Sequence, residues 1–396
     1  MDPISNPYMA AAGARPPSLA GRESLRQTLR IAVERTRRRL STKGAMVVGL
    51  RGSGKTVLLE QCRDEAEAAG AQVVRVDAPA GRSLPALLAP ELRLALLRMS
   101  RDAKCAQAAQ RGLRALAGFA ASLRKSYPDI EVGIDAEPEL GLADSGDLEH
   151  ATQALLQTAS EAAQEGGSAL VLFIDELHDM PSGELGALLR ALHRCVQRRL
   201  PITLIGAGLP HLIGQIRAAR PAAEQLFDCA EIGNLAPADA ARAISEPAAE
   251  LGVHFDEDAL RHMVAATHGN PYFLQELAKQ TWNTAEGSPI TQQDSRNATP
   301  YAIAALDENF FRVGFNRLTS AEKKYLRAMA DLGAGPHRSG DIAAVLARPV
   351  SALGPIRAQL IAKNMIWSPR HGDTCFAAPR FDEFLRRTWP GDSWRH

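Results

Sequence analysis

Residues 49–56 read G-L-R-G-S-G-K-T, and this stretch decides the fold. The apolar residues 45–48 precede it, and residues 57–60, which read V-L-L-E, follow it. A buried strand, a glycine-rich turn and the start of a helix account for this order, because the turn directs successive backbone N–H groups at an anion. The pattern therefore predicts a phosphate-binding loop, with ATP as the expected cofactor.

The side chains of this loop have separate expected roles. Lys55 is predicted to reach the β- and γ-phosphates, and Thr56 to ligate Mg²⁺, which is the second expected cofactor. The backbone of the remaining positions is expected to surround the phosphates. The predicted nucleotide-binding residues of this segment are Gly49, Arg51, Gly52, Ser53, Gly54, Lys55, Thr56 and Val57.

A second nucleotide element is predicted at residues 170–176, which read L-V-L-F-I-D-E. Five apolar residues without alternation suit a strand buried on both faces of a parallel sheet, and ligands bind at the carboxyl ends of such strands. Asp175 is expected to hold Mg²⁺, usually through water, and Glu176 to act as the general base on the attacking water. Lys55 and Glu176 are thus predicted catalytic residues of an ATP hydrolase. We interpret His178 as a surface or helix-capping residue.

Residues 72–77 and 202–206 supply two further predicted strands, each preceded by a helical stretch. This alternation predicts an α/β fold, a three-layer α/β/α sandwich with a parallel sheet. The alternation is interrupted between residues 101 and 150, and residues 126–150 hold eight acidic side chains with no Lys or Arg. We interpret residues 126–150 as a solvated insertion, with a hairpin at residues 130–134 and a regulatory or partner role as open alternatives.

Length and composition exclude several classes of protein. The 396 residues are 45% hydrophobic and carry a net charge of +1, which predicts a soluble protein of two or three domains. Residues 1–19 lack the pattern of a signal peptide, and no apolar run is long enough to span a membrane. A cytoplasmic location without a membrane partner is therefore expected. Five widely spaced cysteines argue against a disulfide framework.

Beyond the predicted sheet, the pattern becomes helical. Pro237 and Pro271 suit the first position of a helix, and Gly269 suits a helix end. Residues 319–322, which read T-S-A-E, form a capping box for the first of three short helices, and two short strands follow them. This last pattern is typical of a winged helix-turn-helix. The predicted divisions are an N-terminal tail at 1–20, the ATPase core at 21–234, a helical lid and linker at 235–305, and the winged helix at 306–396.

The charge of the chain is concentrated near its C-terminus. Residues 310–396 contain 14 Lys or Arg against 7 Asp or Glu, although the total charge is only +1. Such polarisation suits a DNA-facing module on a more acidic ATPase core. Double-stranded DNA is therefore an expected partner, with Arg357, Lys363 and Arg370 as the predicted contacts. A winged helix that contacts only protein is the open alternative.

Several motifs of this chain occur together in one known family. They are G-R-E at residues 21–23, the loop at 49–56, L-V-L-F-I-D-E at 170–176, I-G-A-G-L-P at 205–210 and H-G-N-P-Y-F-L at 268–274. The set resembles the AAA+ ATPases of the origin-recognition-complex-like group, which border on the signal-transduction ATPases with numerous domains. The resemblance covers about residues 18–390.

The resemblance implies further nucleotide contacts and a function. Gly21 and Arg22 are expected to lie against the adenine, and Pro271 to close over the base from the lid. The family also implies a DNA-binding switch in replication initiation, mobile-element maintenance or related control. A signalling-type nucleotide switch with little turnover is the alternative.

The chain departs from that family at two places. Residues 206–208, after the fourth strand, read G-A-G, whereas AAA+ proteins carry a polar sensor residue there. Gln225 stands where relatives tend to have an arginine finger, so Arg217 and Arg220 are the predicted substitutes, acting across an interface with another copy of the chain. Slow hydrolysis is therefore expected, and an ATP-gated switch is favoured over a motor.

Overall fold

The structure is a computed structural model that describes residues 1–11, 13–133, 136–370, 372–391 and 394. The described chain divides into two compact units. One consists of Arg22–Val48 and Lys55–Glu231, and the other of Met1–Gly21, Gly49–Gly54 and Ile232–His396. Among the described residues, no helix is long and apolar enough to cross a membrane.

The first unit is built around a parallel sheet with the strand order β2-β3-β4-β1-β5. Every residue of β3 and β4 is buried, which explains why both strands read as apolar runs without alternation. The register pairs Asp77 of β2 with Asp175 of β3, so two acidic strand ends are neighbours. The strands are β1 (Gly44–Val48), β2 (Gln72–Asp77), β3 (Leu170–Asp175), β4 (Ile202–Gly208) and β5 (Phe227–Glu231).

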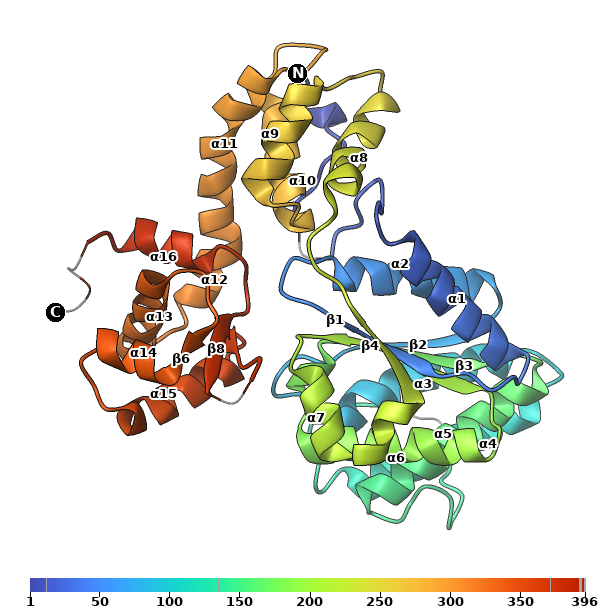
Figure 1. Ribbon diagram of the computed structural model, residues 1–396. Coiled ribbons are helices and arrows are strands. Elements are labelled where there is room, and N and C mark those ends of the chain that lie inside the picture. The colour runs from blue at the N-terminus through green and yellow to red at the C-terminus, as the bar shows by residue number, and fades with distance from the viewer. Residues whose placement is uncertain (12, 134–135, 371, 392–393, 395–396) are drawn as a thin grey trace. The chain divides into compact units, whose positions relative to one another are not determined.

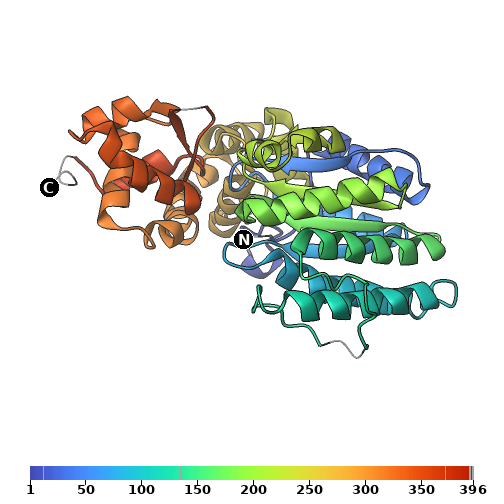
Figure 2. The same ribbon diagram turned by 90° about the horizontal axis from the view of Figure 1, so that it is seen from below.

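Helices cover both faces of this sheet, and the predicted three-layer α/β/α architecture is confirmed (Figure 1). Helices α1 and α2 lie over one face. Helices α4, α5 and α6 lie side by side in the opposite layer, where α3 packs against α4 (Figure 2). The helices of this unit are α1 (Glu23–Arg37), α2 (Lys55–Ala68), α3 (Leu84–Met99), α4 (Ala106–Leu123), α5 (Leu148–Glu165), α6 (Ser182–Gln197) and α7 (Leu212–Ala219).

The described residues of the acidic segment 126–150 are mostly exposed or half-buried, but some of its carboxylates have partners within the chain. Its last residues begin α5, and the described part of the hairpin expected at 130–134 contains no strand. Asp129 accepts hydrogen bonds from the backbone N–H (2.9 Å) and the hydroxyl (2.8 Å) of Ser83. Asp147 caps α5 by accepting the N–H of His150 at 2.9 Å, and that bond lowers the pKa of Asp147. Acidic side chains therefore fix this connection to its own unit.

In the second unit, the N-terminal segment packs on a group of helices. The hydroxyl of Tyr8 donates to the carbonyl of Ile244 at 2.5 Å, and the indole N–H of Trp282 donates to the carbonyl of Asp2 at 2.9 Å. Tyr8 is 3% exposed, so residues expected to form a tail belong to this helical core. The helices are α8 (Pro237–Ala249), α9 (Glu257–Thr267), α10 (Pro271–Thr284) and α11 (Gln292–Leu306).

The C-terminal residues of the same unit form short helices and an antiparallel sheet with the order β6-β8-β7. Thr319 and Glu322 form the capping box that the sequence predicted. Phe384 is fully buried and stacks on Phe311 and Phe381 at ring-centroid distances of 5.3 and 5.4 Å. The elements are α12 (Arg312–Phe315), α13 (Ser320–Leu332), β6 (His337–Arg338), α14 (Ser339–Val345), α15 (Val350–Ala362), β7 (Ile366–Trp367), β8 (Asp373–Phe376) and α16 (Phe381–Thr388).

The aromatic stack generates a prediction about stability. Phe384→Ala should destabilise the C-terminal part by about 3–5 kcal/mol, because it removes a buried ring and leaves a cavity. Three of the four tryptophans lie beyond residue 366, so urea unfolding followed by tryptophan fluorescence reports on this region. Val313→Ala, at a side chain that is half exposed, is the matched control. A midpoint shift no larger than that of the control would contradict the packing described above.

Candidate nucleotide site

The two predicted Mg²⁺ ligands lie in direct contact within the first unit. Thr56 stands at the start of α2, and its hydroxyl donates to Oδ2 of Asp175 at 2.5 Å. Oδ1 of Asp175 accepts the N–H of Glu176 at 2.8 Å, and Asp175 is only 6% exposed. Hydroxyl and carboxylate oxygens are hard ligands that suit Mg²⁺, which takes one or two such groups together with the phosphates of a nucleotide. The donor set therefore fits the expected ion.

The backbone conformation of the phosphate loop requires glycine at two positions. Gly52 and Gly54 have φ angles of +78° and +88°, in the left-handed region where residues with a Cβ are strained. Lys55 follows at once as the first residue of α2 and is 6% exposed. The backbone geometry thus accounts for the glycine spacing that the sequence displayed.

The other predicted residues of the loop are placed as follows. Gly49 follows β1, and Val57 lies in the first turn of α2. Ser53 is buried, and its N–H donates to the carbonyl of Leu50 at 3.3 Å. The N–H of Arg51 donates to the carbonyl of Ala377 at 3.1 Å. The Arg51 bond ties the loop to the residue that follows β8 in the second unit.

Glu176 has the backbone and the exposure of a reactive carboxylate. Its φ and ψ are 50° and 33°, a left-handed conformation that costs free energy in a residue with a side chain. Its side chain is 47% exposed, in contrast to the buried Asp175 beside it. Water can therefore reach the carboxylate that was predicted as the general base.

His178 is not the surface or capping residue that the sequence suggested. Its side chain is 1% exposed, because the turn Leu177–Asp179 folds back beside the end of β4. Gln215 donates from Nε2 to the carbonyl of His178 at 3.0 Å, and the ring of His211 meets the His178 ring edge to face at 5.2 Å. Burial lowers the pKa of His211, although Asp179 opposes the shift. The apolar run before Asp175 was the only sequence signal for this burial.

The residues predicted to contact adenine lie at element ends. Gly21 ends the N-terminal segment, Arg22 is the N-cap of α1, and Pro271 is the first residue of α10. Within the second unit, the N–H of Tyr272 donates to the carbonyl of Gly52 at 3.3 Å. Asn270, which belongs to the motif at 268–274, is 1% exposed and caps α10 by accepting the N–H of Phe273. The adenine contacts stay predictions.

The candidate arginine fingers differ in their surroundings. A guanidinium nitrogen of Arg220 lies 2.5 Å from Nδ1 of His193 on α6. Burial, followed by the charge of Arg220, lowers the pKa of His193 and favours the neutral ring that can accept this bond. Arg217 is exposed on α7, and Gln225 is exposed in the turn Pro221–Leu226. The contact within its own chain argues against Arg220 as a finger, whereas Arg217 stays a prediction.

Two of the three predicted DNA contacts have partners inside the C-terminal part. Arg357 donates to the hydroxyls of Ser368 (2.8 Å) and Thr374 (3.0 Å) and to the carbonyl of Asp373 (3.0 Å). These bonds join α15 to Ser368, which follows β7, and to the first two residues of β8. The donors of Arg357 are therefore used to hold the hairpin, which argues against its predicted role on DNA.

Lys363 has a similar structural role. Its ammonium group lies 2.7 Å from both carboxylate oxygens of Glu322, whose side chain is fully buried. Burial opposes ionisation of Glu322, but the bonds from Lys363 and Thr319 outweigh it and lower its pKa. The pair fixes the end of α15 to the start of α13. Among the predicted DNA contacts, Arg370 is exposed between β7 and β8.

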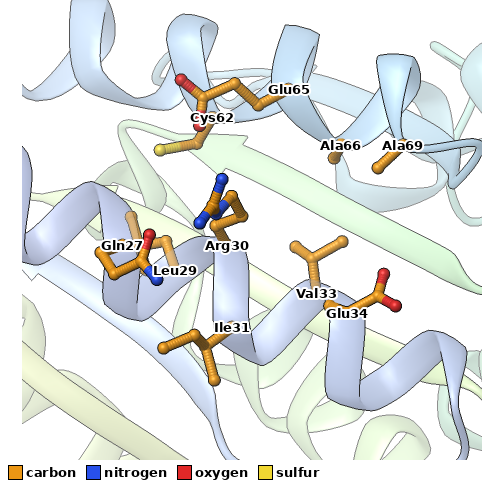
Figure 3. Close-up of a pocket in the computed structure, with 10 residues that line it drawn as sticks. All are labelled: Gln27, Leu29, Arg30, Ile31, Val33, Glu34, Cys62, Glu65, Ala66 and Ala69. Carbon is orange, nitrogen blue, oxygen red and sulfur yellow. The ribbon is translucent and has the colours of Figure 1, made fainter.

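A surface pocket of about 310 Å³ lies between α1 and α2, away from the residues predicted to bind ATP. Figure 3 shows Arg30 and Val33 of α1 facing Cys62 and Ala66 of α2 across it. Burial raises the pKa of Cys62 to about 12, so its thiol is not a nucleophile near neutral pH. The thiol of this pocket is therefore not the reactive group of a catalytic site.

Comparison with known families supports the nucleotide site. Residues 18–205 match the family described as the AAA ATPase domain, and this range contains the loop, Asp175 and Glu176. Residues 308–385 match a second family, described as a domain of unknown function. No curated protein matches the chain.

Two solved structures have the same fold along nearly the whole chain. A Walker-type ATPase of Pyrococcus abyssi is 16% identical, with 94% of this chain and 97% of the other covered and a TM-score of 0.59. Cdc6p from Pyrobaculum aerophilum is 15% identical, with 98% and 99% covered and a TM-score of 0.50. The protein thus has a P-loop AAA+ fold, and its residues 18–205 are similar to the AAA ATPase domain. These findings support the AAA+ part of the resemblance.

The site predicts a separation of binding from turnover. Glu176→Gln should keep the affinity for MgATP and abolish most hydrolysis, because it removes the base and leaves Lys55, Thr56 and Asp175 in place. Lys55→Ala should lose nucleotide binding instead. Nucleotide affinity and phosphate release are measured on the same purified variants. Undiminished release from Glu176→Gln would remove that residue from the mechanism.

Proposed function

We propose that the protein is a MgATP-dependent switch that hydrolyses ATP slowly and engages duplex DNA through residues 306–396. The bond between Thr56 and Asp175, next to the half-exposed Glu176, is the observation that carries the ATPase part. Thr56 and Asp175 would hold Mg²⁺ with the nucleotide phosphates, and Glu176 would take a proton from the attacking water. The bound ion would neutralise charge that develops on the phosphates.

We infer slow ATP hydrolysis from the residues expected to assist Glu176. Residues 206–208 at the end of β4 offer no polar side chain to orient the water. Arg220 is occupied by His193, and Gln225 has no charge with which to stabilise the transition state. An arginine finger raises kcat by about three to five orders of magnitude in related phosphoryl transfers. The loss of an arginine at position 225 therefore favours a slow switch over a motor.

An assembly of several copies is part of this proposal, with Arg217 as the residue that acts in trans. Hydrolysis per protomer should then rise with protein concentration, because the finger is supplied by a neighbouring copy. Arg217→Ala should lower turnover without weakening ATP binding, and Arg220→Ala, which removes the contact with His193, is the comparison variant. A rate per protomer that is flat over the range where the protein self-associates would exclude a finger in trans.

We further propose the domain division 21–234, 235–305 and 306–396 as core, lid and winged helix. The order α13, α14, α15 and then the hairpin of β7 and β8, with β6 as the third strand, supports the last assignment. DNA replication initiation, mobile-element maintenance or a related control process is the setting in which such a switch would act.

The proposed DNA contacts differ from those expected from the sequence. Arg338, Arg348 and Arg370 are exposed, and Arg338 pairs with Asp373 in the register of β6 and β8. Arg338 is thereby next to the loop that carries Arg370. These side chains suit contacts to phosphates rather than to base edges, because Arg357 of α15 is held inside the domain.

Salt dependence tests the DNA proposal. The double variant Arg338→Ala/Arg370→Ala should weaken binding and reduce the slope of log affinity against log salt by roughly 2, because each arginine that neutralises a phosphate accounts for about 1. Fluorescence anisotropy with a DNA duplex and the full chain measures both quantities. Arg261→Ala/Arg296→Ala in the lid removes the same charge from exposed positions and should change neither. Equal slopes for the two double variants would contradict the proposed contacts.

A second function is favoured by the surface of α15. Arg357 is the only charged residue between positions 350 and 362, although DNA-reading helices present polar and basic side chains to base edges. A winged helix that contacts protein would use this uncharged face in a signalling-type switch. Absence of DNA binding even at low salt would make protein binding the leading function of this region. The exposed residues of α15 are Val350, Ser351, Ala352, Gly354, Pro355, Ala358, Gln359 and Ala362.

A further inference from the structure

One nitrogen of the buried His178 lies near both a hydrogen-bond acceptor and a hydrogen-bond donor. Nδ1 lies 3.3 Å from Oε2 of Glu176 and 3.3 Å from the backbone N of Leu209, which follows β4. The carboxylate needs a donor, whereas the N–H of Leu209 needs an acceptor. A neutral imidazole carries one proton, so Nδ1 serves only one of these two partners at a time.

The surroundings of the ring are arranged for a histidine. Oδ1 of Asp179 lies 3.7 Å from Nε2, on the opposite edge of the ring from Glu176. The absence of a side chain at Gly208 makes room, because a Cβ there would lie 3.0 Å from Nδ1. Gly208 at the end of β4 is therefore part of the pocket that holds the imidazole.

We propose that His178 is the positioning residue for Glu176 and connects it to the end of β4, where the polar sensor side chain is missing. With its proton on Nδ1, the ring donates to the Glu176 carboxylate and restrains it. With the same proton on Nε2, toward Asp179, Nδ1 accepts the N–H of Leu209, and the Glu176 carboxylate loses the restraint that positions it as the base. The imidazole keeps one proton in both states. The inference rests on the proposed hydrolysis.

Movement of the β4 end would thus change the position of the base through one bond. A shift of Leu209 away from the ring favours the bond to Glu176, and its return favours release of the carboxylate. His178 touches neither water nor nucleotide in this scheme, so it should affect kcat and leave the KM for ATP unchanged. Loss of a hydrogen bond to a charged group corresponds to roughly ten- to hundredfold in rate.

Substitutions at His178 in the full chain test the inference through steady-state phosphate release. His178→Ala should lower kcat by about tenfold or more, with the KM for ATP within about twofold. His178→Asn can place an amide group near the position of Nδ1 and should recover part of kcat. His178→Gln places its amide near the position of Nε2, is the matched control, and should stay low. Equal activities of the Asn and Gln variants, or an unchanged kcat in all three, would overturn the inference.

A double-mutant cycle separates positioning from general damage. In the Glu176→Gln background, His178→Ala should add less than about twofold to the loss, since the carboxylate that it positions is gone. An equally large loss in both backgrounds would mean that His178 acts only through folding. Thermal unfolding of each variant is measured in parallel. If His178→Ala does not fold, the inference is tested with the His178→Asn and His178→Gln pair and with Gly208→Ala, whose added methyl group crowds Nδ1. Full activity of Gly208→Ala would then count against the inference.

The same experiment distinguishes the two levels of the proposal. Wild-type turnover that Glu176→Gln abolishes but that all His178 variants retain would overturn only the role of His178. A wild-type protein that binds ATP without hydrolysing it would overturn the proposed hydrolysis, and the role of His178 with it.

Discussion

The hydrogen bond between Thr56 and Asp175 is the interaction on which the first unit and its chemistry depend. It joins the start of α2 to the end of β3, although 119 positions separate the two residues in the sequence. Parallel strands align their carboxyl ends along one edge of the sheet, so this single bond requires β1, β3 and β4 to be in register. A hydroxyl and a buried carboxylate in contact are also the hard oxygen pair that Mg²⁺ prefers.

Polar side chains that look alike in the sequence differ in their burial and in their partners within the fold. Asp175 and Glu176 are neighbours in sequence, yet one is 6% exposed and the side chain of the other is 47% exposed. The buried carboxylate is fixed by two hydrogen bonds, whereas the exposed one is open to water. The same distinction applies in the C-terminal part, where Arg357 and Lys363 are used internally. A positive charge in the sequence is therefore a weak guide to a nucleic-acid surface.

Local patterns were predictable where the chain itself supplies both partners. Thr319 and Glu322 lie three residues apart, so their capping box could be predicted from the sequence. Burial of His178 and packing of Tyr8 on α8 could not, because their partners come from distant elements. The attachment of the acidic interval could not be predicted for the same reason, because Asp129 is held by Ser83, 46 residues away.

The sequence alone predicts the phosphate loop, the buried strand that leads to Asp175 and Glu176, and the alternation of strands and helices in the first unit. Backbone geometry imposes those patterns locally, as the positive φ angles of Gly52 and Gly54 illustrate. Only the tertiary structure decided that Nδ1 of His178 faces both Glu176 and Leu209, and that Lys363 is paired with Glu322. The pairing of side chains from separate elements depends on how those elements pack, and no periodicity along one element contains that information.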